Sequence, residues 1–382
     1  MDTSWWKSKD ELDEVQKEFI LLPPDGKISL EGPPGSGKTN LLLLRAQYIS
    51  GQGDKNILVL TYTNALSDFM RRGVAAKGLI SGEQVKTFHS WANEHVKQYL
   101  GQWLMPEGGD FTDEVRDRAV GMLEEANKNV PTKKLYQAIF VDEAQDFTQD
   151  ELHALLVLSD KVCICGDSRQ GIYQRDGMLV ANKMGMKKYA LKNHYRIGHK
   201  IARVADRLMA PADGEDSLES TSNYNAKLYG TSSARMHECG SRAEQFARMS
   251  ELLAVQLDAY KGDSIGILCA KRETVAEVLD LLKNSEFEKY LAGPVDGFGG
   301  ERVIHVMTIH SSKGLEFRAV HMFGVEEMRQ YPSNRTKLAY TAVTRAKTAL
   351  NAYRTGPTSA ALEAAFSEPK HVELDDIFPG QI

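Results

Sequence analysis

The sequence lacks the features of a secreted, membrane-spanning or disulfide-stabilised protein. Its 382 residues include only four cysteines, too few for a disulfide framework in a chain of this size. No apolar run approaches the ~18 residues of a membrane-spanning helix, and the first ten residues hold no apolar segment of signal-peptide length. We therefore expect a soluble, cytoplasmic protein from a reducing compartment, with no membrane partner.

An excess of charge of one sign is also missing. The net charge is −5, and the composition is globular, with 42% hydrophobic and 26% charged residues. The total charge gives no sign of a nucleic-acid binder, but a local basic stripe would not show in that total. The length allows sizeable cores and about two or three domains.

Two of the cysteines, Cys163 and Cys165, alternate in the apolar stretch "VCICG". Such alternation places both side chains on one face of a strand. A pair of core side chains therefore explains them better than a metal site, which needs more ligands than these two.

Apolar strands alternate with helical patterns along the chain, which is typical of parallel sheets with helical crossovers. We expect helices at 37–50, 64–78 and 272–284, and strands at 27–32, 56–63, 137–144, 161–167, 264–270, 303–309 and 319–325. The fold class is therefore α/β, with two parallel-sheet domains. We place these domains at 1–190 and 191–382, with a ligand cleft between them at the carboxyl ends of the strands.

The stretch "GPPGSGKT", residues 32–39, lies between a predicted strand and a predicted helix and fits G-x-x-x-x-G-K-[ST]. Glycines let successive backbone N–H groups turn toward phosphate oxygens, and a helix start favours anions. A chance glycine-rich turn is the alternative. In a phosphate-binding loop, Lys38 would reach the β- and γ-phosphates and Thr39 would hold Mg²⁺. The loop would comprise Gly32, Pro33, Pro34, Gly35, Ser36, Gly37, Lys38 and Thr39.

A second signal, an acidic one, follows the phosphate loop by about a hundred residues, in "FVDEAQD" (140–146). The apolar strand ends in Asp142 and Glu143, so it delivers two carboxylates to the edge of the sheet. Asp142 suits the shell of a Mg²⁺ ion, and Glu143 suits the polarising of a water molecule that attacks the γ-phosphorus. Together with the phosphate loop, this pair predicts a nucleoside triphosphatase.

Eight segments, in order and spread over nearly the whole chain, resemble the motifs of UvrD/Rep-type superfamily 1 DNA helicases. The resemblance implies two RecA-like domains with ATP and Mg²⁺ bound in the cleft between them. The segments are "DEVQKEFI" (13–20), "LTYTNALSDFM" (60–70), "VKTFHSW" (85–91), "VDEAQDF" (141–147), "ICGDSRQGIY" (164–173), "LKNHYRIGHKIARVA" (191–205), "VMTIHSSKGLEF" (306–317) and "LAYTAVTRAK" (338–347).

The resemblance also implies roles around the nucleotide. Gln16 would read the adenine edge, Tyr195 would stack on the adenine, and Glu316 would bind the ribose. Gln170 would sense the γ-phosphate. Arg196 and Arg345 would reach across from the second domain as arginine fingers, whose planar forks suit phosphate oxygens. The alternatives are surface ion pairs for the arginines and core packing for Tyr195.

The same resemblance places contacts to single-stranded DNA, with or without a duplex junction, along the top of both domains. Any base offers a π-face to a tyrosine ring, and hydroxyl and imidazole groups can bond phosphates. The residues implied are Thr61, Tyr62, Asn64, His89, Ser90, Thr308 and His310.

The chain also departs from the larger relatives of this family. Only residues 92–136 fill the place of a first inserted subdomain, and no room remains for a second one before the fifth motif. The segment after the sixth motif shows no counterpart of a strand-splitting hairpin. Arg175 or a neighbour stands where a base-stacking tryptophan often follows the third motif.

Three functions stay open at this point. The first is an ATP-driven translocase or helicase that moves 3′ to 5′ on single-stranded DNA. The second is an ATPase switch in a larger repair, phage-replication or defence complex, where a protein partner supplies unwinding or nuclease activity. The third is a related activity on RNA, because contacts to the backbone do not reveal from sequence whether the 2′-OH is read.

Overall fold

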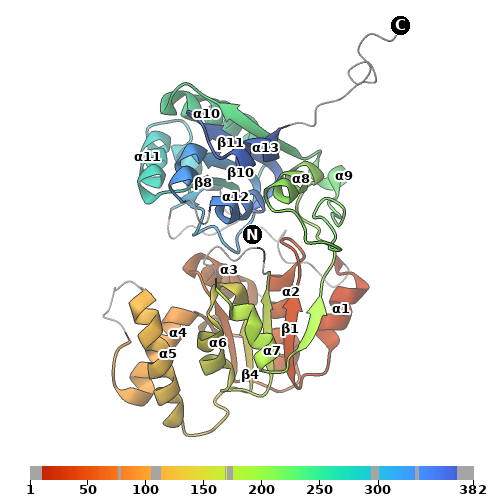
Figure 1. Cartoon of the computed structure of the whole chain (residues 1–382), viewed down its shortest axis with the longest axis vertical. Helices are drawn as coiled ribbons and strands as arrows, with labels where there is room; N and C mark the ends of the chain where they lie inside the picture. Colours follow the sequence, from red (N-terminus) through yellow and green to blue (C-terminus); the bar gives the residue numbers. More distant parts are fainter. Residues whose placement is uncertain are drawn as a thin grey trace.

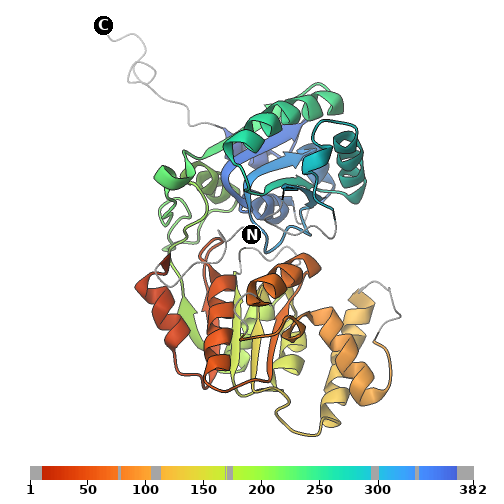
Figure 2. The same ribbon diagram turned by 180° about the vertical axis from the view of Figure 1, so that it is seen from behind.

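The computed structural model describes residues 11–75, 79–104, 113–167, 169, 175–293, 301–331 and 335–367. These residues form two β-sheets, each flanked by helices, one above the other along the longest axis (Figures 1 and 2). All strand pairings that join neighbours within the two sheets are parallel. Among the residues covered, no helix is both long enough and apolar enough to cross a membrane.

The first sheet has the strand order β3-β2-β4-β5-β1-β6. Strands β2, β4 and β5 are buried over their full length, as their apolar sequences require. Because the strands are parallel, their carboxyl ends meet at one edge of the sheet. The strands are β1 (Lys27–Glu31), β2 (Ile57–Thr61), β3 (Val85–Thr87), β4 (Ala138–Val141), β5 (Val162–Gly166) and β6 (Lys187–Ala190).

Helices cover both faces of this sheet and divide its core in two. One core joins the strands to α1 (Glu14–Leu21), α2 (Lys38–Gly51) and α3 (Asn64–Ala75), and it contains Cys163 and Cys165. Both thiols therefore lie on one face of β5, as the alternation predicts. The other core joins the strands to α4 (Phe88–Leu100), α5 (Asp113–Lys128), α6 (Gln149–Leu156) and α7 (Val180–Lys183).

The second sheet has the order β7-β11-β10-β8-β9 and is also covered on both faces. Its strands are β7 (Ser233–Glu238), β8 (Ile265–Cys269), β9 (Ile304–Thr308), β10 (Phe317–Phe323) and β11 (Ala346–Arg354). Its helices are α8 (His199–Leu208), α9 (Ala226–Tyr229), α10 (Arg242–Ala259), α11 (Arg272–Lys283), α12 (Arg335–Val343) and α13 (Ala360–Phe366).

The predicted α/β class with two parallel sheets is confirmed. We propose 1–190 and 191–382 as the two domains; β6 ends at Ala190 and β7 begins at Ser233, so the change of sheet falls after this limit. The sequence did not predict β3, β6, β7 or β11. Strand β3 has three residues, and β6 and β7 are edge strands with mostly exposed or half-buried residues, so neither shows an apolar run. Strand β11 is rich in alanine, which favours helices in isolation.

The segments that correspond to the family's insertions are small. Helices α4 and α5 pack against each other and lie to one side of the first sheet in both views (Figures 1 and 2). Between α11 and β9, the described residues hold one short 3₁₀ helix, Glu288–Tyr290. After β11, residues 355–367 contain α13 and no strand.

Candidate nucleotide and nucleic-acid sites

The phosphate loop runs from the end of β1 to the start of α2. Gly35 and Gly37 have φ values of 77° and 88°, which side chains other than glycine rarely adopt. The Lys38 ammonium donates to the carbonyls of Gly32 and Pro33, at 2.9 and 3.0 Å, and so folds back over the loop. The Ser36 hydroxyl is buried without a hydrogen-bond partner. The loop is therefore built to receive an anion at the start of a helix.

Thr39 and Asp142 meet at the floor of this loop. The Thr39 hydroxyl donates to Asp142 Oδ2 at 2.7 Å, and the Cys165 thiol donates to Asp142 Oδ1 at 2.8 Å. Burial, and then the Glu143 carboxylate, raise the pKa of Asp142 to about 6, against the hydrogen bonds from Cys165 and Thr39. A hydroxyl and a carboxylate in contact fit Mg²⁺, which takes few protein ligands and shares its shell with phosphates and water. In the residues that the structure covers, no cluster of three or more His, Cys, Asp or Glu side chains could hold a metal by itself.

Glu143 has a strained backbone directly after Asp142. Its φ of 54° makes it the one non-glycine residue with a positive φ in the described part of the chain. Such a conformation costs on the order of 1–3 kcal/mol and is found most often at functional sites. Burial alone would raise the pKa of this carboxyl group, but the charges of Lys313, Lys38 and Arg345 outweigh burial and lower it. The Gln145 amide also donates to it. Glu143 is therefore held ionised, as a general base must be.

Two arginines of the second domain lie at this site, Arg196 against the phosphate loop and Arg345 within electrostatic reach of Glu143. Arg196 packs closely against the loop at Gly35. The space is so tight that a Cβ atom added to Gly35 would lie 2.9 Å from the Cβ atom of Arg196. Its guanidinium pairs with Glu316 at 2.9 Å and donates to the Thr344 carbonyl at 2.9 Å.

Arg345 is buried just before β11, and it donates to the carbonyls of Thr341 and Leu315 at 3.2 Å each. Burial, and then Arg196, lower the pKa of Arg345 to about 10, while Glu143 raises it. Arg345 is buried and so is not the surface ion pair that was the alternative, whereas Arg196 does pair with the half-buried Glu316.

The residues expected around the base also lie beside the phosphate loop. Gln16 closes the N-terminal cap of α1 with Asp13, and its amide donates to the Ser36 carbonyl at 3.1 Å. The Tyr195 backbone N–H donates to Gly35 O at 3.1 Å, and its hydroxyl donates to Asp13. Tyr195 is half-buried and does not belong to a hydrophobic core. Gln170 lies outside the described residues.

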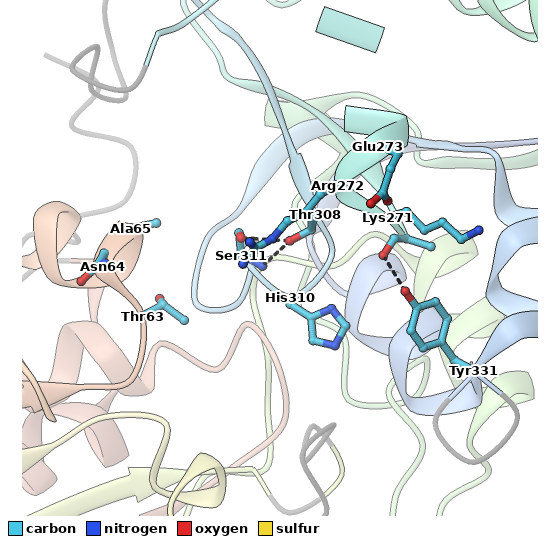
Figure 3. Close-up of a pocket in the computed structure, with 11 residues that line it drawn as sticks. Thr63, Asn64, Ala65, Lys271, Arg272, Glu273, Thr308, His310, Ser311 and Tyr331 are labelled. Atoms are coloured by element: carbon cyan, nitrogen blue, oxygen red, sulfur yellow. Dashed lines mark hydrogen bonds between the residues drawn. The ribbon is translucent and has the colours of Figure 1, made fainter. Parts of the chain in front are cut away.

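A cavity of about 690 Å³ lies between the two domains (Figure 3). Thr63, Asn64 and Ala65 line it from the first domain. Across from them, Figure 3 shows side chains from the carboxyl ends of β8 and β9 and from the start of α11. This far wall comprises Ala270, Lys271, Arg272, Glu273, Thr308, His310, Ser311 and Tyr331. Three of the expected nucleic-acid residues, Asn64, Thr308 and His310, thus line one cavity.

Sequence reasoning missed Lys271 and Arg272. Both follow the last residue of β8 by two or three positions, so they lie at the same sheet edge as Thr308 at the end of β9. The signal that could have found them is a basic pair directly after an apolar strand, in "GILCAKR". These two cations supply the local positive charge that the total charge of the chain conceals.

The other four expected contacts lie in the first domain, outside the lining of that cavity. The Tyr62 ring packs edge-on against His89 and Phe147, with ring centres 5.1 and 5.6 Å apart. Its hydroxyl accepts hydrogen bonds from Arg116 at 2.7 Å and from Arg175 at 3.0 Å. Thr61 is buried at the end of β2, and Ser90 donates to Glu94.

His89 is neutral in this setting. Burial, and then the charges of Arg116 and Arg175, lower its pKa to about 3. Arg116 comes from α5, in the reduced insertion, and it also pairs with Glu151 at 2.6 Å. Sequence reasoning missed Arg116, because nothing in the sequence of α5 indicates that it reaches Tyr62.

Comparisons with known proteins support this arrangement. A family model of the UvrD-like helicase C-terminal domain matches residues 303–353, which contain Glu316 and Arg345. A second model, described as an AAA domain, matches residues 16–176, which contain the phosphate loop and the acidic pair. Residues 303–353 thus match the C-terminal domain of UvrD-like helicases, and residues 16–176 match an AAA domain. These two domains indicate an ATP-hydrolysing helicase.

Solved structures also resemble this chain. One is the structure of PRRSV helicase, with 17% sequence identity and a TM-score of 0.42. The match covers 89% of this chain and 54% of the PRRSV chain, so this chain spans about half the length of that relative. No curated protein matches the sequence.

Replacing Lys38 with alanine should lower ATP turnover roughly 10²–10³-fold, the usual loss when one donor to a developing charge is removed. Lys38 belongs to no hydrophobic core, so the fold should persist. The measurement is steady-state ATP hydrolysis, with thermal unfolding as the check on the fold. Lys55→Ala is the matched control, because Lys55 also donates to a carbonyl, that of Ser50, at the other end of α2. Normal turnover in Lys38→Ala would remove Lys38 from the phosphate site.

Proposed function

We propose that the protein is an ATP-dependent translocase or helicase that moves 3′ to 5′ on single-stranded DNA. The observation that carries this proposal is the pairing of two sites between the same two domains. Across one part of the interface, Arg196 packs against the phosphate loop and Arg345 interacts electrostatically with Glu143. The cavity lined by Asn64, Thr308 and Lys271 spans another part. Closure of the domains on ATP therefore moves the walls of both sites together.

In the ATP site, each proposed role follows from the contacts described. Lys38 and the backbone of residues 32–39 hold the β- and γ-phosphates, and Thr39 and Asp142 would hold Mg²⁺. When bound, Mg²⁺ would neutralise phosphate charge. Glu143, held ionised and strained, accepts the proton of the attacking water.

Arg196 and Arg345 stabilise the charge that develops on the transferring phosphoryl group. Glu316 pairs with Arg196 and so orients that guanidinium, and it is the proposed contact to the ribose. Tyr195 and Gln16 flank the adenine, and Gln170 is the proposed sensor of the γ-phosphate.

On the strand side, the cavity offers the two kinds of contact that single strands need. Lys271 and Arg272 provide charge for phosphates, and the polar groups of Thr308 and His310 provide hydrogen bonds. Tyr62, with His89 and Ser90, extends this surface over the first domain as a platform for bases, whereas Thr61 is buried and would support it from within. Because the strand would be held through its phosphates and by stacking of its bases, the affinity should depend little on base sequence.

Lys271→Ala and Arg272→Ala should each weaken binding of an oligothymidylate and flatten its salt dependence. Because each removes one phosphate contact, the slope of log K against log salt should fall by about one. Fluorescence anisotropy at several salt concentrations measures both quantities. Lys283→Ala, at the far end of the same helix α11, is the matched control and should bind as the wild type does. An unchanged salt slope in both cavity variants would place the strand elsewhere.

The small insertions favour a second candidate, an ATPase switch that acts with a protein partner. Between β3 and β4, the described residues form only α4 and α5, and Arg116 of α5 supports Tyr62. A duplex with a 3′ single-stranded tail separates the candidates. The translocase proposal expects the strand to stimulate hydrolysis even where long duplexes are unwound weakly. We propose a cytoplasmic location for either activity.

A further inference from the structure

A buried ion pair joins the two domains beside the ATP site. Asp146 lies in the 3₁₀ helix Ala144–Asp146, after β4, and Lys313 lies in the turn after β9. The Lys313 ammonium contacts Asp146 Oδ1, and the two side chains are 1% and 0% exposed. The other carboxylate oxygen, Oδ2, is buried with no hydrogen-bond partner. Lys313 therefore compensates most of this buried charge, and the pair requires the domains to be together.

On the first-domain side, the pair is connected to Glu143. The Asp146 backbone N–H donates to the Glu143 carbonyl at 2.9 Å, which closes the turn that holds Glu143 at its positive φ. Gln145, between them, donates its side-chain amide to the Glu143 carboxylate. A displacement of Asp146 would therefore move the carboxylate that acts on the water.

On the second-domain side, the pair is connected to the cavity. The turn that carries Lys313 starts at Thr308, whose carbonyl accepts from the Ser312 N–H at 3.1 Å. The Lys313 N–H in turn approaches the His310 carbonyl at 3.4 Å. Thr308, His310 and Ser311 line the cavity, and Lys313 does not (Figure 3). A strand that orders this turn would set the position of the Lys313 ammonium.

We infer that Lys313 and Asp146 are positioning residues that couple the filling of the cavity by nucleic acid to the placement of Glu143 for hydrolysis. The inference rests on the proposed function, because it takes nucleic acid as the ligand of the cavity. It adds a specific device: one ion pair, made from opposite domains, links the cavity turn to the turn of the general base. When the cavity is empty, no ligand orders the turn after β9 that carries Lys313. The Glu143 carboxylate then lies less often in the position from which it accepts the proton of the attacking water.

The test is Lys313→Met in the full chain, which removes the charge and keeps the length of the side chain. ATP turnover is measured with and without saturating oligothymidylate, and kcat and KM for ATP are determined in both conditions. We expect the stimulation ratio to fall about tenfold, within the usual range of coupling between two sites. The KM for ATP should change little, because the Lys313 ammonium pairs with Asp146, which lies outside the phosphate loop. Asp146→Asn should give the same loss.

Two controls separate coupling from stability. Lys161→Met breaks an ion pair to Asp54 at 2.6 Å within the first domain, and it should keep the wild-type ratio. The double variant Lys313→Met/Asp146→Leu removes both buried charges, so neither is left without its partner. It replaces Lys313→Met in the test if the single variant unfolds. It should fold, as thermal unfolding will show, and still respond weakly to the strand.

The outcomes distinguish this inference from the proposed function. A stimulated wild type with equal stimulation in Lys313→Met or in the double variant would overturn the coupling role alone. A wild type that no single strand stimulates would overturn the proposed function, and the coupling role with it. A loss of stimulation in both variants, with the control unchanged, supports the inference.

Discussion

Arg345→Ala should lower kcat for ATP hydrolysis roughly 10³–10⁵-fold, the range for arginine fingers in phosphoryl transfer. Arg345 interacts electrostatically with Glu143, and hydrogen bonds to the carbonyls of Thr341 and Leu315 hold its guanidinium group in place. An arginine held in place in this way loses no further freedom when charge develops on the phosphoryl group. The KM for ATP should change far less than kcat, because the lost interaction forms mainly in the transition state.

Arg318→Ala is the matched control for this variant. Arg318 is also a largely buried arginine of the second domain, but it packs on Tyr229 and Tyr260, away from the phosphate loop. It should keep kcat near the wild-type value. Arg345→Lys retains a charge but not the planar fork, so it should remain slow. A variant in which only the affinity for ATP falls would show that Arg345 is a binding contact.

Glu143→Gln should lower turnover roughly 10²–10⁴-fold, the range for a general base, while nucleotide binding persists. The amide has nearly the shape of the carboxylate but cannot accept the proton of the attacking water. Single-turnover hydrolysis and binding of a fluorescent ATP analogue measure the two effects separately. This variant should also hold single-stranded DNA in the ATP-bound state.

Glu125→Gln, on the exposed surface of α5, makes the same chemical change outside both sites and should leave turnover unaltered. Thermal unfolding of Glu143→Gln matters here, because the residue occupies a strained turn. Wild-type turnover in a folded Glu143→Gln protein would exclude this carboxylate from the mechanism.

The parts of the fold that could be predicted from sequence are those in which neighbouring residues determine the structure. Apolar runs such as those of β2 and β5 are buried on both faces, so their sequences alone mark them as strands. The phosphate loop is equally local, because its glycines, Lys38 and Thr39 are contiguous. Edge strand β6, with the sequence "KKYA", pairs on one side only and has no such pattern.

Contacts between distant segments could not be predicted in the same way. Arg116 and Tyr62 are 54 residues apart, and Lys313 and Asp146 are 167 residues apart. Taken alone, Arg116, Lys313 and Asp146 look like ordinary surface charges and Tyr62 like an ordinary aromatic residue. Only the packing of α5 and the meeting of the two domains bring the partners together. The positive φ of Glu143 is likewise invisible in the sequence "VDEAQ", since nothing there requires a left-handed turn.

The central claim is that one pair of domains joins an ATP site to a nucleic-acid site. The most direct test is the rate of ATP hydrolysis by the purified chain with no polymer, with single-stranded DNA and with single-stranded RNA. The account predicts a low basal rate and a strong increase with single-stranded DNA, which weakens steeply as salt is raised. A larger increase with RNA would show that RNA is the substrate, and the proposed translocase activity would still stand. An ATPase rate that no nucleic acid alters would contradict the claim and leave a switch that answers to a protein partner.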